Sequence, residues 1–367
     1  MHVNEIYLEG FRNYESAAAR FCGGVNVIAG RNAQGKTNLL EAVSYLATGR
    51  SFRLAADKDI IAFEKDGACI RAEIHSGGRE QTLQARLFRG RRRELCANGV
   101  KLKKASELAG RLATVVFCPE DLGIVKDGAS VRRKLLDQCL SQLRPGYLAA
   151  LTEFNRLYEN KTRILKGYHE KPALLELLDD FNLRLAEQSA RLIYYRSAFS
   201  EVLKAKAAEI HCEFSDGAEE LAIRYRTAGD IDPVGKSPEE LLPELVVRQR
   251  ELLQAELRSG LCLSGAHKDD LEIEINGAPA RKFASQGQAR TAAVSIKLAE
   301  RALHFEDGKE YPILLLDDVL SELDAARQRF ILGRIRHGQA LITCCDEAAV
   351  SGISAGALLR VEGGRIT

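Results

Sequence analysis

The stretch Gly30-Arg31-Asn32-Ala33-Gln34-Gly35-Lys36-Thr37 decides the fold, because it fits the pattern GxxxxGK[ST] of a phosphate-binding loop. The residues before it predict a strand that ends at Gly30, and residues 38–48 predict a helix closed by Gly49. In such a loop the backbone N–H groups surround phosphate oxygens, and the positive end of the helix points at the same place. Lys36 would reach the β- and γ-phosphates of a nucleotide, and the Thr37 hydroxyl could bind Mg²⁺.

An acidic partner for the metal follows a strongly apolar segment, Ile313-Leu314-Leu315-Leu316-Asp317-Asp318. Four consecutive apolar residues predict a strand that is buried on both faces of a parallel sheet. Asp317 would hold Mg²⁺ directly or through water, and Asp318 would polarise the attacking water. Two acids that merely cap a surface strand are the alternative, which the phosphate-binding loop in the same chain disfavours.

The composition is that of an ordinary globular protein and gives no overall sign of its partner. The chain has 367 residues, 46% of them hydrophobic, with a formal net charge of +2. A disordered polyelectrolyte and a globally basic nucleic-acid binder are therefore excluded. We find no apolar run of about 18 residues and no signal-peptide pattern. The nine cysteines form no CxxC pair, which favours reduced thiols, so we expect a cytoplasmic protein without membrane association.

Hydrophobic patterns divide the chain into α/β ends and a helical middle. Short β segments follow one another from about 68 to 104, with Asn98-Gly99 as a hairpin turn. Residues from about 130 to 260 are mainly helical and include apolar residues spaced by seven from Leu178 to Phe199. We expect an α/β head whose first part, with an added β lobe, is 1–125. A helical arm would occupy 126–260, and the second part of the head 261–367.

Six segments in a fixed order resemble the RecF family of SMC-like, ABC-type ATPases. They are Phe11-Arg12-Asn13-Tyr14, Gly30 to Asn38, Pro119-Glu120-Asp121-Leu122, Gly265-Ala266-His267-Lys268-Asp269-Asp270-Leu271, Ser285-Gln286-Gly287-Gln288, and Asp317 to Asp324. Each is weak alone, but the ordered set extends over nearly the whole chain. The interval from Lys36 to Ser285 is longer than in transporter ATPase subunits and shorter than in full SMC proteins. The resemblance implies a P-loop ABC-type ATPase head that binds ATP and Mg²⁺.

The resemblance also implies a head-to-tail homodimer that encloses two ATP molecules. Ser285 and Gly287, with Gln288 in the same signature, would contact the γ-phosphate bound to the other subunit, and Asp324 would lie at the dimer seam. Arg12 and Asn13 would reach the base or the phosphates. The expected nucleotide-binding residues are Arg12, Asn13, Gly30, Arg31, Asn32, Ala33, Gln34, Gly35, Lys36, Thr37, Ser285, Gly287, Gln288 and Asp324, with Lys36, Asp317 and Asp318 as catalytic residues and Thr37 and Asp317 as metal ligands.

The chain departs from the ABC pattern near the catalytic residues. Most ABC ATPases carry glutamate where Asp318 stands, and the shorter carboxylate suggests slow hydrolysis. Thr343-Cys344-Cys345-Asp346 stands where transporter subunits carry a histidine. No Q-loop glutamine is obvious, and Glu120 is the polar side chain available in its place.

A local basic patch contrasts with the neutral whole. Residues 86–104 contain eight basic residues and one acid. A basic hairpin could lie along a phosphate backbone, although a solvated edge that prevents strand aggregation is the alternative. Aromatic residues for stacking single-stranded bases are absent, which favours duplex or junction DNA. The expected DNA-binding residues are Arg89, Arg91, Arg92, Arg93, Lys101, Lys103 and Lys104.

The leading functional hypothesis is a weakly hydrolysing, DNA-dependent ATPase of recombinational repair and replication restart. By resemblance it would act on gapped or junction DNA together with RecR and, through RecR, with RecO and RecA. It would help RecA to replace single-strand-binding protein on the DNA. A chromosome-organising SMC-type ATPase, a transporter ATPase subunit and a small-molecule kinase are the alternatives.

Overall fold

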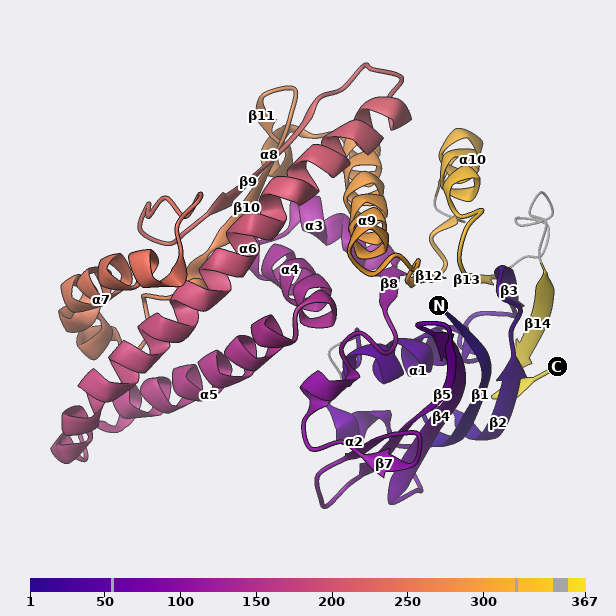
Figure 1. The fold of residues 1–367 in the computed structure, drawn as a ribbon, viewed down its shortest axis with the longest axis horizontal. Coiled ribbons are helices and arrows are strands. Elements are labelled where there is room, and N and C mark those ends of the chain that lie inside the picture. The colour runs from indigo at the N-terminus through magenta and orange to yellow at the C-terminus, as the bar shows by residue number, and fades with distance from the viewer. Residues whose placement is uncertain (54–55, 321–322, 346–355) are drawn as a thin grey trace. The chain divides into compact units, whose positions relative to one another are not determined.

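The chain forms two compact units in the computed structural model, which describes residues 1–367 except 54–55, 321–322 and 346–355. The first unit combines Met1–Asp121 with Ala293–Thr367, and the second is Leu122–Ala292 (Figure 1). The sequence places the second boundary near 260. The second unit extends to Ala292, and it includes strand β10 (Asp270–Ile275), which pairs with strand β9 (Leu221–Arg226).

A mostly parallel sheet of six strands belongs to the first unit. Its strands, in spatial order, are β15 (Arg365–Ile366), β14 (Ala357–Glu362), β3 (Val25–Ala29), β13 (Ala340–Cys344), β12 (Ile313–Leu316) and β8 (Thr114–Phe117). β12 lies between two parallel neighbours, and all four of its residues are buried. The prediction of a doubly buried parallel strand is therefore confirmed.

An antiparallel sheet of six strands belongs to the same unit. Its strands, in spatial order, are β2 (Tyr14–Arg20), β1 (His2–Phe11), β4 (Gly67–Ser76), β5 (Arg79–Phe88), β6 (Glu94–Ala97) and β7 (Val100–Lys101). Between β6 and β7, φ is 51° at Asn98 and 77° at Gly99. These left-handed conformations are those of a tight hairpin turn, as the Asn-Gly pair predicts.

Helix α1 (Lys36–Thr48) contacts strands of both sheets and completes one core. Leu39, Leu40 and Val43 of this helix are fully buried there. Burial of a leucine or valine side chain contributes roughly 1.5–3 kcal/mol. The helix ends at Gly49, whose φ of 67° is left-handed and whose N–H donates to the Tyr45 carbonyl. This is the glycine stop that the sequence predicts.

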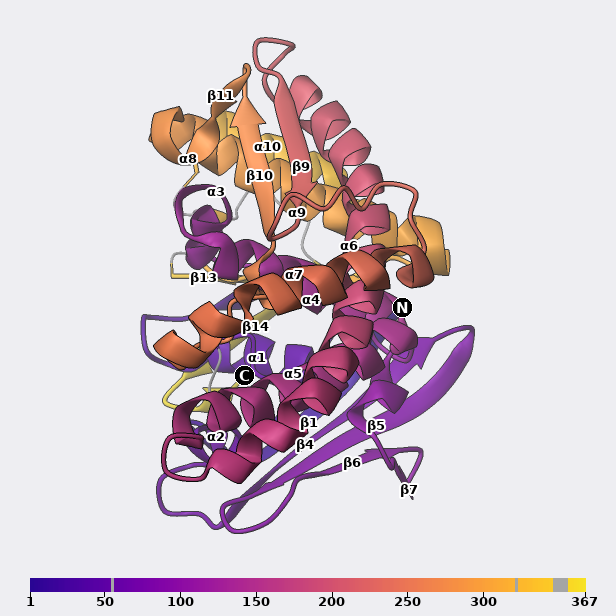
Figure 2. The same ribbon diagram turned by 90° about the vertical axis from the view of Figure 1, so that its left-hand side faces the viewer.

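The second unit consists of long helices with a small three-stranded sheet. Its elements are α3 (Gly123–Lys126), α4 (Ala129–Leu143), α5 (Pro145–Gly167), α6 (Leu178–Phe214), β9, α7 (Pro238–Ser259), β10, β11 (Ala278–Pro279) and α8 (Ala280–Phe283). The seven-residue spacing lies on α6, which runs beside α5 (Figure 2). Sequence patterns miss β9, which lies inside the stretch expected to be helical.

The remaining elements are short or join the two units. They are α2 (Asp57–Ile60), α9 (Gln286–Gly308), α10 (Ala325–Arg334), and 3-10 helices at Ala105–Leu108, Pro119–Leu122, Pro172–Leu177 and Ala266–Lys268. Among the described residues, no helix combines the length and apolar character that crossing a bilayer requires.

Candidate nucleotide-binding site

The loop of residues 30–37 connects the end of β3 to the start of α1, and two of its glycines are required by the backbone. Gly35 has a φ of 121°, and a Cβ there would come within 2.7 Å of the Asn13 side chain. A Cβ on Gly30 would come within 2.3 Å of the Val361 carbonyl oxygen. Any larger residue at either position would therefore open the loop.

The Lys36 side chain folds back into the curve of this loop. Its ammonium donates to the carbonyl oxygens of Gly30 at 2.8 Å and Arg31 at 3.2 Å. The Asp318 carboxylate lies 4.0 Å away. Because Lys36 is only 4% exposed, its positive charge is concentrated at the position where a phosphate-binding loop holds the terminal phosphates.

The Thr37 hydroxyl and the Asp317 carboxylate form a preassembled pair. Thr37 donates to Asp317 Oδ1 at 2.9 Å, and Thr343 donates to the same oxygen at 3.0 Å. The pKa of Asp317 is raised above its usual value, mainly because the carboxyl group is buried. The hydrogen bonds from Thr37 and Thr343 lower this pKa, and the charges of Asp318 and Glu120 raise it. Neighbouring oxygen ligands of an octahedral Mg²⁺ lie about 3.0 Å apart, so this pair fits the metal.

Asp318 follows Asp317 with a left-handed backbone, with a φ of 52°. Its N–H donates to the Thr343 hydroxyl at 2.8 Å, which fixes the turn after β12. Its carboxylate faces Lys36 rather than Thr37. Two adjacent acids thus point to different parts of the site, one towards the metal pair and the other towards the ammonium.

Arg12 and Asn13 act on the loop region in different ways. Arg12 forms two hydrogen bonds with the fully buried carboxylate of Glu41, at 2.7 and 2.9 Å, and a third with the Asp59 carbonyl. Asn13 donates to the Gln34 carbonyl at 2.7 Å and so supports the loop from outside. Glu41 is a site residue that the sequence analysis misses, because a helical glutamate gives no sign of a partner 29 residues away.

A cleft of about 850 Å³ opens beside the loop. Lys36, Thr37 and Asp318 line one part of it, and the segment 58–63 lines another. Phe63 belongs to that segment and is 96% exposed, so its ring offers a stacking surface for a base. The sequence analysis finds the phosphate end of this cleft and misses the opposite wall, which carries no recognisable motif.

Arg89 supports this wall instead of forming part of a free basic patch. Its guanidinium donates to the carbonyl oxygens of Lys65 at 2.9 Å and Ala62 at 3.1 Å, and to three more carbonyls between residues 58 and 63. Its exposed charge is therefore already engaged by backbone dipoles. The expectation that Arg89 contacts DNA stays a prediction, but the structure gives it a second role beside the cleft.

The other six basic residues expected to bind DNA fall into two groups. Arg93 pairs with Asp57 at 3.0 Å, and Arg91 and Lys101 both pair with Glu94. Arg92, Lys103 and Lys104 are exposed and form no ion pair within the part of the chain that the structure describes. The second group thus lacks ion pairs within the described residues, although Glu107 accepts the backbone N–H of Lys104 at 2.9 Å.

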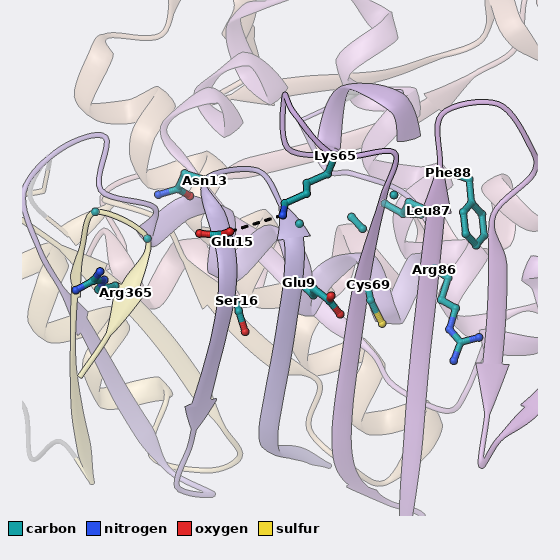
Figure 3. Close-up of a pocket in the computed structure, with 15 residues that line it drawn as sticks. Glu9, Asn13, Glu15, Ser16, Lys65, Cys69, Arg86, Leu87, Phe88 and Arg365 are labelled. Atoms are coloured by element: carbon teal, nitrogen blue, oxygen red, sulfur yellow. Dashed lines mark ion pairs between the residues drawn. The ribbon is translucent and has the colours of Figure 1, made fainter.

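A second cavity, of about 830 Å³, lies on the outer face of the antiparallel sheet (Figure 3). Lys65 and Arg86 line it together with Glu9 and Glu15, and Lys65 pairs with Glu15 at 3.6 Å. Arg365 lines its edge. Acids and bases are thus mixed on this face, which does not form the continuous basic strip that a phosphate backbone requires.

The proposed signature residues lie at the start of helix α9. The Ser285 N–H donates to the Gln288 side chain at 2.9 Å, and the Gln288 N–H donates to the Ser285 hydroxyl at 3.2 Å. Gly287 is in the first turn of this helix. Asp324 caps α10 by accepting from the Arg327 N–H at 2.9 Å. The nearby motif residues Ser321, Glu322 and Asp346 lie outside the described residues.

Comparisons with known proteins agree on one family. The family model described as RecF/RecN/SMC N terminal domain matches residues 2–362. The chain is 36% identical to the DNA replication and repair protein RecF of Acetivibrio thermocellus, with 100% of this chain and 99% of that protein covered. It is 41% identical to the protein of the same name from Listeria monocytogenes serotype 4b, with 91% and 90% covered.

Solved structures give the same result for the fold. The recombination mediator protein RecF with ATP, of the RecFOR pathway, has a TM-score of 0.92 and 35% identity, with 100% of this chain and 97% of that chain covered. The Smc head domain of Pyrococcus furiosus has a TM-score of 0.55 and 16% identity over 100% and 95%. The second likeness concerns the fold alone.

Proposed function

Because the chain belongs to the RecF family of DNA replication and repair proteins, we propose that it is an ATP-dependent DNA-binding protein of recombinational repair and replication restart. The single observation that carries the proposal is the Thr37–Asp317 pair beside the buried Lys36 ammonium. A bound nucleoside triphosphate needs positive charge near its phosphates and ligands for its metal ion. Lys36 offers the charge, and Thr37 and Asp317 offer the ligands.

The residues of the loop would bind ATP in the cleft described above. Lys36 would exchange its carbonyl partners for the β- and γ-phosphates, while Thr37 and Asp317 would hold Mg²⁺. The metal supplies neutralisation of the charge that develops on the phosphates. Asp318 would accept the proton of the attacking water. Its carboxylate also attracts Lys36, so hydrolysis is expected to be weak until DNA is bound.

ATP would join two copies head to tail, with Ser285, Gly287 and Gln288 of one copy completing the site of the other and Asp324 at the seam. The closed dimer would hold duplex, gapped or junction DNA, and hydrolysis would release it. Partners would include RecR and, through RecR, RecO and RecA, in the cytoplasm. The likeness to a recombination mediator protein of the RecFOR pathway supports these partners.

Sedimentation of the purified protein with and without ATP, Mg²⁺ and gapped duplex DNA tests the proposal. We expect a monomer without ATP, a dimer with ATP, and co-sedimentation with DNA only when ATP is present. Lys36→Met should abolish both ATP effects, because it removes the buried ammonium. Lys171→Met, at an exposed lysine, is the matched control and should behave as wild type. A wild-type monomer that ignores DNA at saturating ATP would contradict the proposal.

A further inference from the structure

One cysteine of the segment that stands where transporter subunits carry a histidine lies within the nucleotide site. Cys345 directly follows β13, whose end lies beside that of β3 and therefore near the phosphate-binding loop. Its Sγ is 3.4 Å from the Lys36 ammonium, 2.8 Å from Asn32 Oδ1 and 3.7 Å from Asp318 Oδ1. The thiol thus touches three groups that line the cleft where the terminal phosphate would be held.

This thiol is also open to reagents. All nine cysteines lie in the described part of the chain, none of them forms a disulfide there, and among them only Cys212 and Cys345 are exposed. A solvent-accessible thiol can exchange with a disulfide dissolved in the surrounding solvent. Cys212 is on the second unit, and its thiol has no hydrogen bond with a lysine within the described residues, so it provides an internal comparison.

We propose that Cys345 is a modification site at which a low-molecular-weight disulfide reversibly switches off ATP binding. The inference rests on the proposed ATP-binding function. A substituent on Sγ would occupy the space between Lys36 and Asp318, so it would exclude the terminal phosphate. Glutathione would also place carboxylates beside a site that attracts anions. These carboxylates would repel the triphosphate of ATP by like charge, in addition to the steric effect of the substituent.

The chemical step is a thiol–disulfide exchange that needs no further oxidant. The Cys345 sulfur, as thiolate, attacks one sulfur of the disulfide, and a new S–S bond forms while the original S–S bond breaks. The other half of the reagent leaves as a thiolate and takes up the proton that Cys345 gave to solvent. A dithiol reductant reverses the exchange and regenerates the free Cys345 thiol.

Treatment of the full-length protein with oxidised glutathione tests the inference. Mass spectrometry of the peptides locates the adduct, and titration with a fluorescent ATP analogue in the presence of Mg²⁺ measures affinity before treatment, after treatment and after dithiothreitol. We expect glutathione to form an adduct on Cys345, and we expect bound ATP to slow the formation of this adduct. The adduct should lower the affinity for ATP by an order of magnitude or more, because of steric clash and like charge. Dithiothreitol should restore the ATP affinity fully.

Two variants separate this site from other thiols. Cys345→Ser should keep whatever ATP affinity it starts with when it is treated, whereas Cys212→Ser should lose affinity in the same way as wild type. The inference is overturned if protein with glutathione on Cys345 binds ATP as tightly as untreated protein, or if Cys345 stays unmodified while Cys212 reacts. Untreated wild-type protein that fails to bind ATP would instead contradict the proposed function itself.

Discussion

At the scale of single residues, the site depends on two adjacent carboxylates that have different principal partners. Asp317 continues the strand and accepts hydrogen bonds from Thr37 and Thr343. Asp318 adopts a left-handed φ of 52°, which turns its carboxylate to Lys36. A left-handed conformation costs a residue other than glycine about 1 kcal/mol.

This division predicts different defects for two isosteric substitutions. Asp318→Asn should leave Mg²⁺-dependent ATP binding near the wild-type level and lower the DNA-stimulated hydrolysis rate about a hundredfold, because the proton acceptor is lost. Asp317→Asn should instead weaken ATP binding when Mg²⁺ is present, because a metal ligand is lost. Equilibrium titration and phosphate release measure the two quantities. Equal loss of binding in both variants would show that the carboxylates share one role.

At the scale of elements, the sequence predicts those parts of the site whose signals are local. The glycine-rich loop, the apolar segment at 313–316 and the Asn98-Gly99 turn are each specified within a few residues, and the structure has each of them. The Arg12–Glu41 pair, the cleft wall at 58–63 and strand β9 depend on partners distant in the chain. No residue type or spacing marks such contacts, so they become visible only in the folded molecule.

A buried ion pair in the second unit illustrates such a contact between elements. Lys161 of α5 lies 2.7 Å from Glu256 of α7, and both side chains are completely buried. Glu256 also accepts the N–H of Leu263 at 2.7 Å, so it holds the end of α7 to the chain that follows. Removal of the lysine would leave a buried carboxylate without its counter-charge.

We therefore expect Lys161→Met to lower the free energy of unfolding of the protein by about 3–5 kcal/mol. Lys166→Met, at an exposed lysine of the same helix, should change it by less than about 0.5 kcal/mol. The double variant Lys161→Met/Glu256→Gln should recover part of the loss, since the unpaired charge is gone. Urea denaturation followed by circular dichroism measures all three, and a small loss in Lys161→Met would mean that water reaches Glu256.

At the scale of the whole molecule, a nearly neutral chain must present a basic surface if it is to hold DNA. The count of eight bases against one acid in residues 86–104 overstates that surface, because Asp57, which lies outside the segment, pairs with Arg93. Glu94 pairs with two further bases, and Arg89 is engaged by carbonyl groups. Linear charge counts miss such partners. Of the eight bases, Arg86, Arg92, Lys103 and Lys104 are exposed and form no ion pair within the described residues.

Simultaneous replacement of Arg92, Lys103 and Lys104 by alanine should therefore weaken ATP-dependent DNA binding. Each lost phosphate contact should also reduce the slope of log affinity against log salt concentration by about 1. The same change at Arg163, Lys166 and Lys171 removes equal charge from exposed positions of the second unit and serves as the control. Fluorescence anisotropy at several salt concentrations measures both quantities. An unchanged slope in the first variant would mean that DNA binds to a different face, and the hairpin edge would then serve only to keep strands from aggregating.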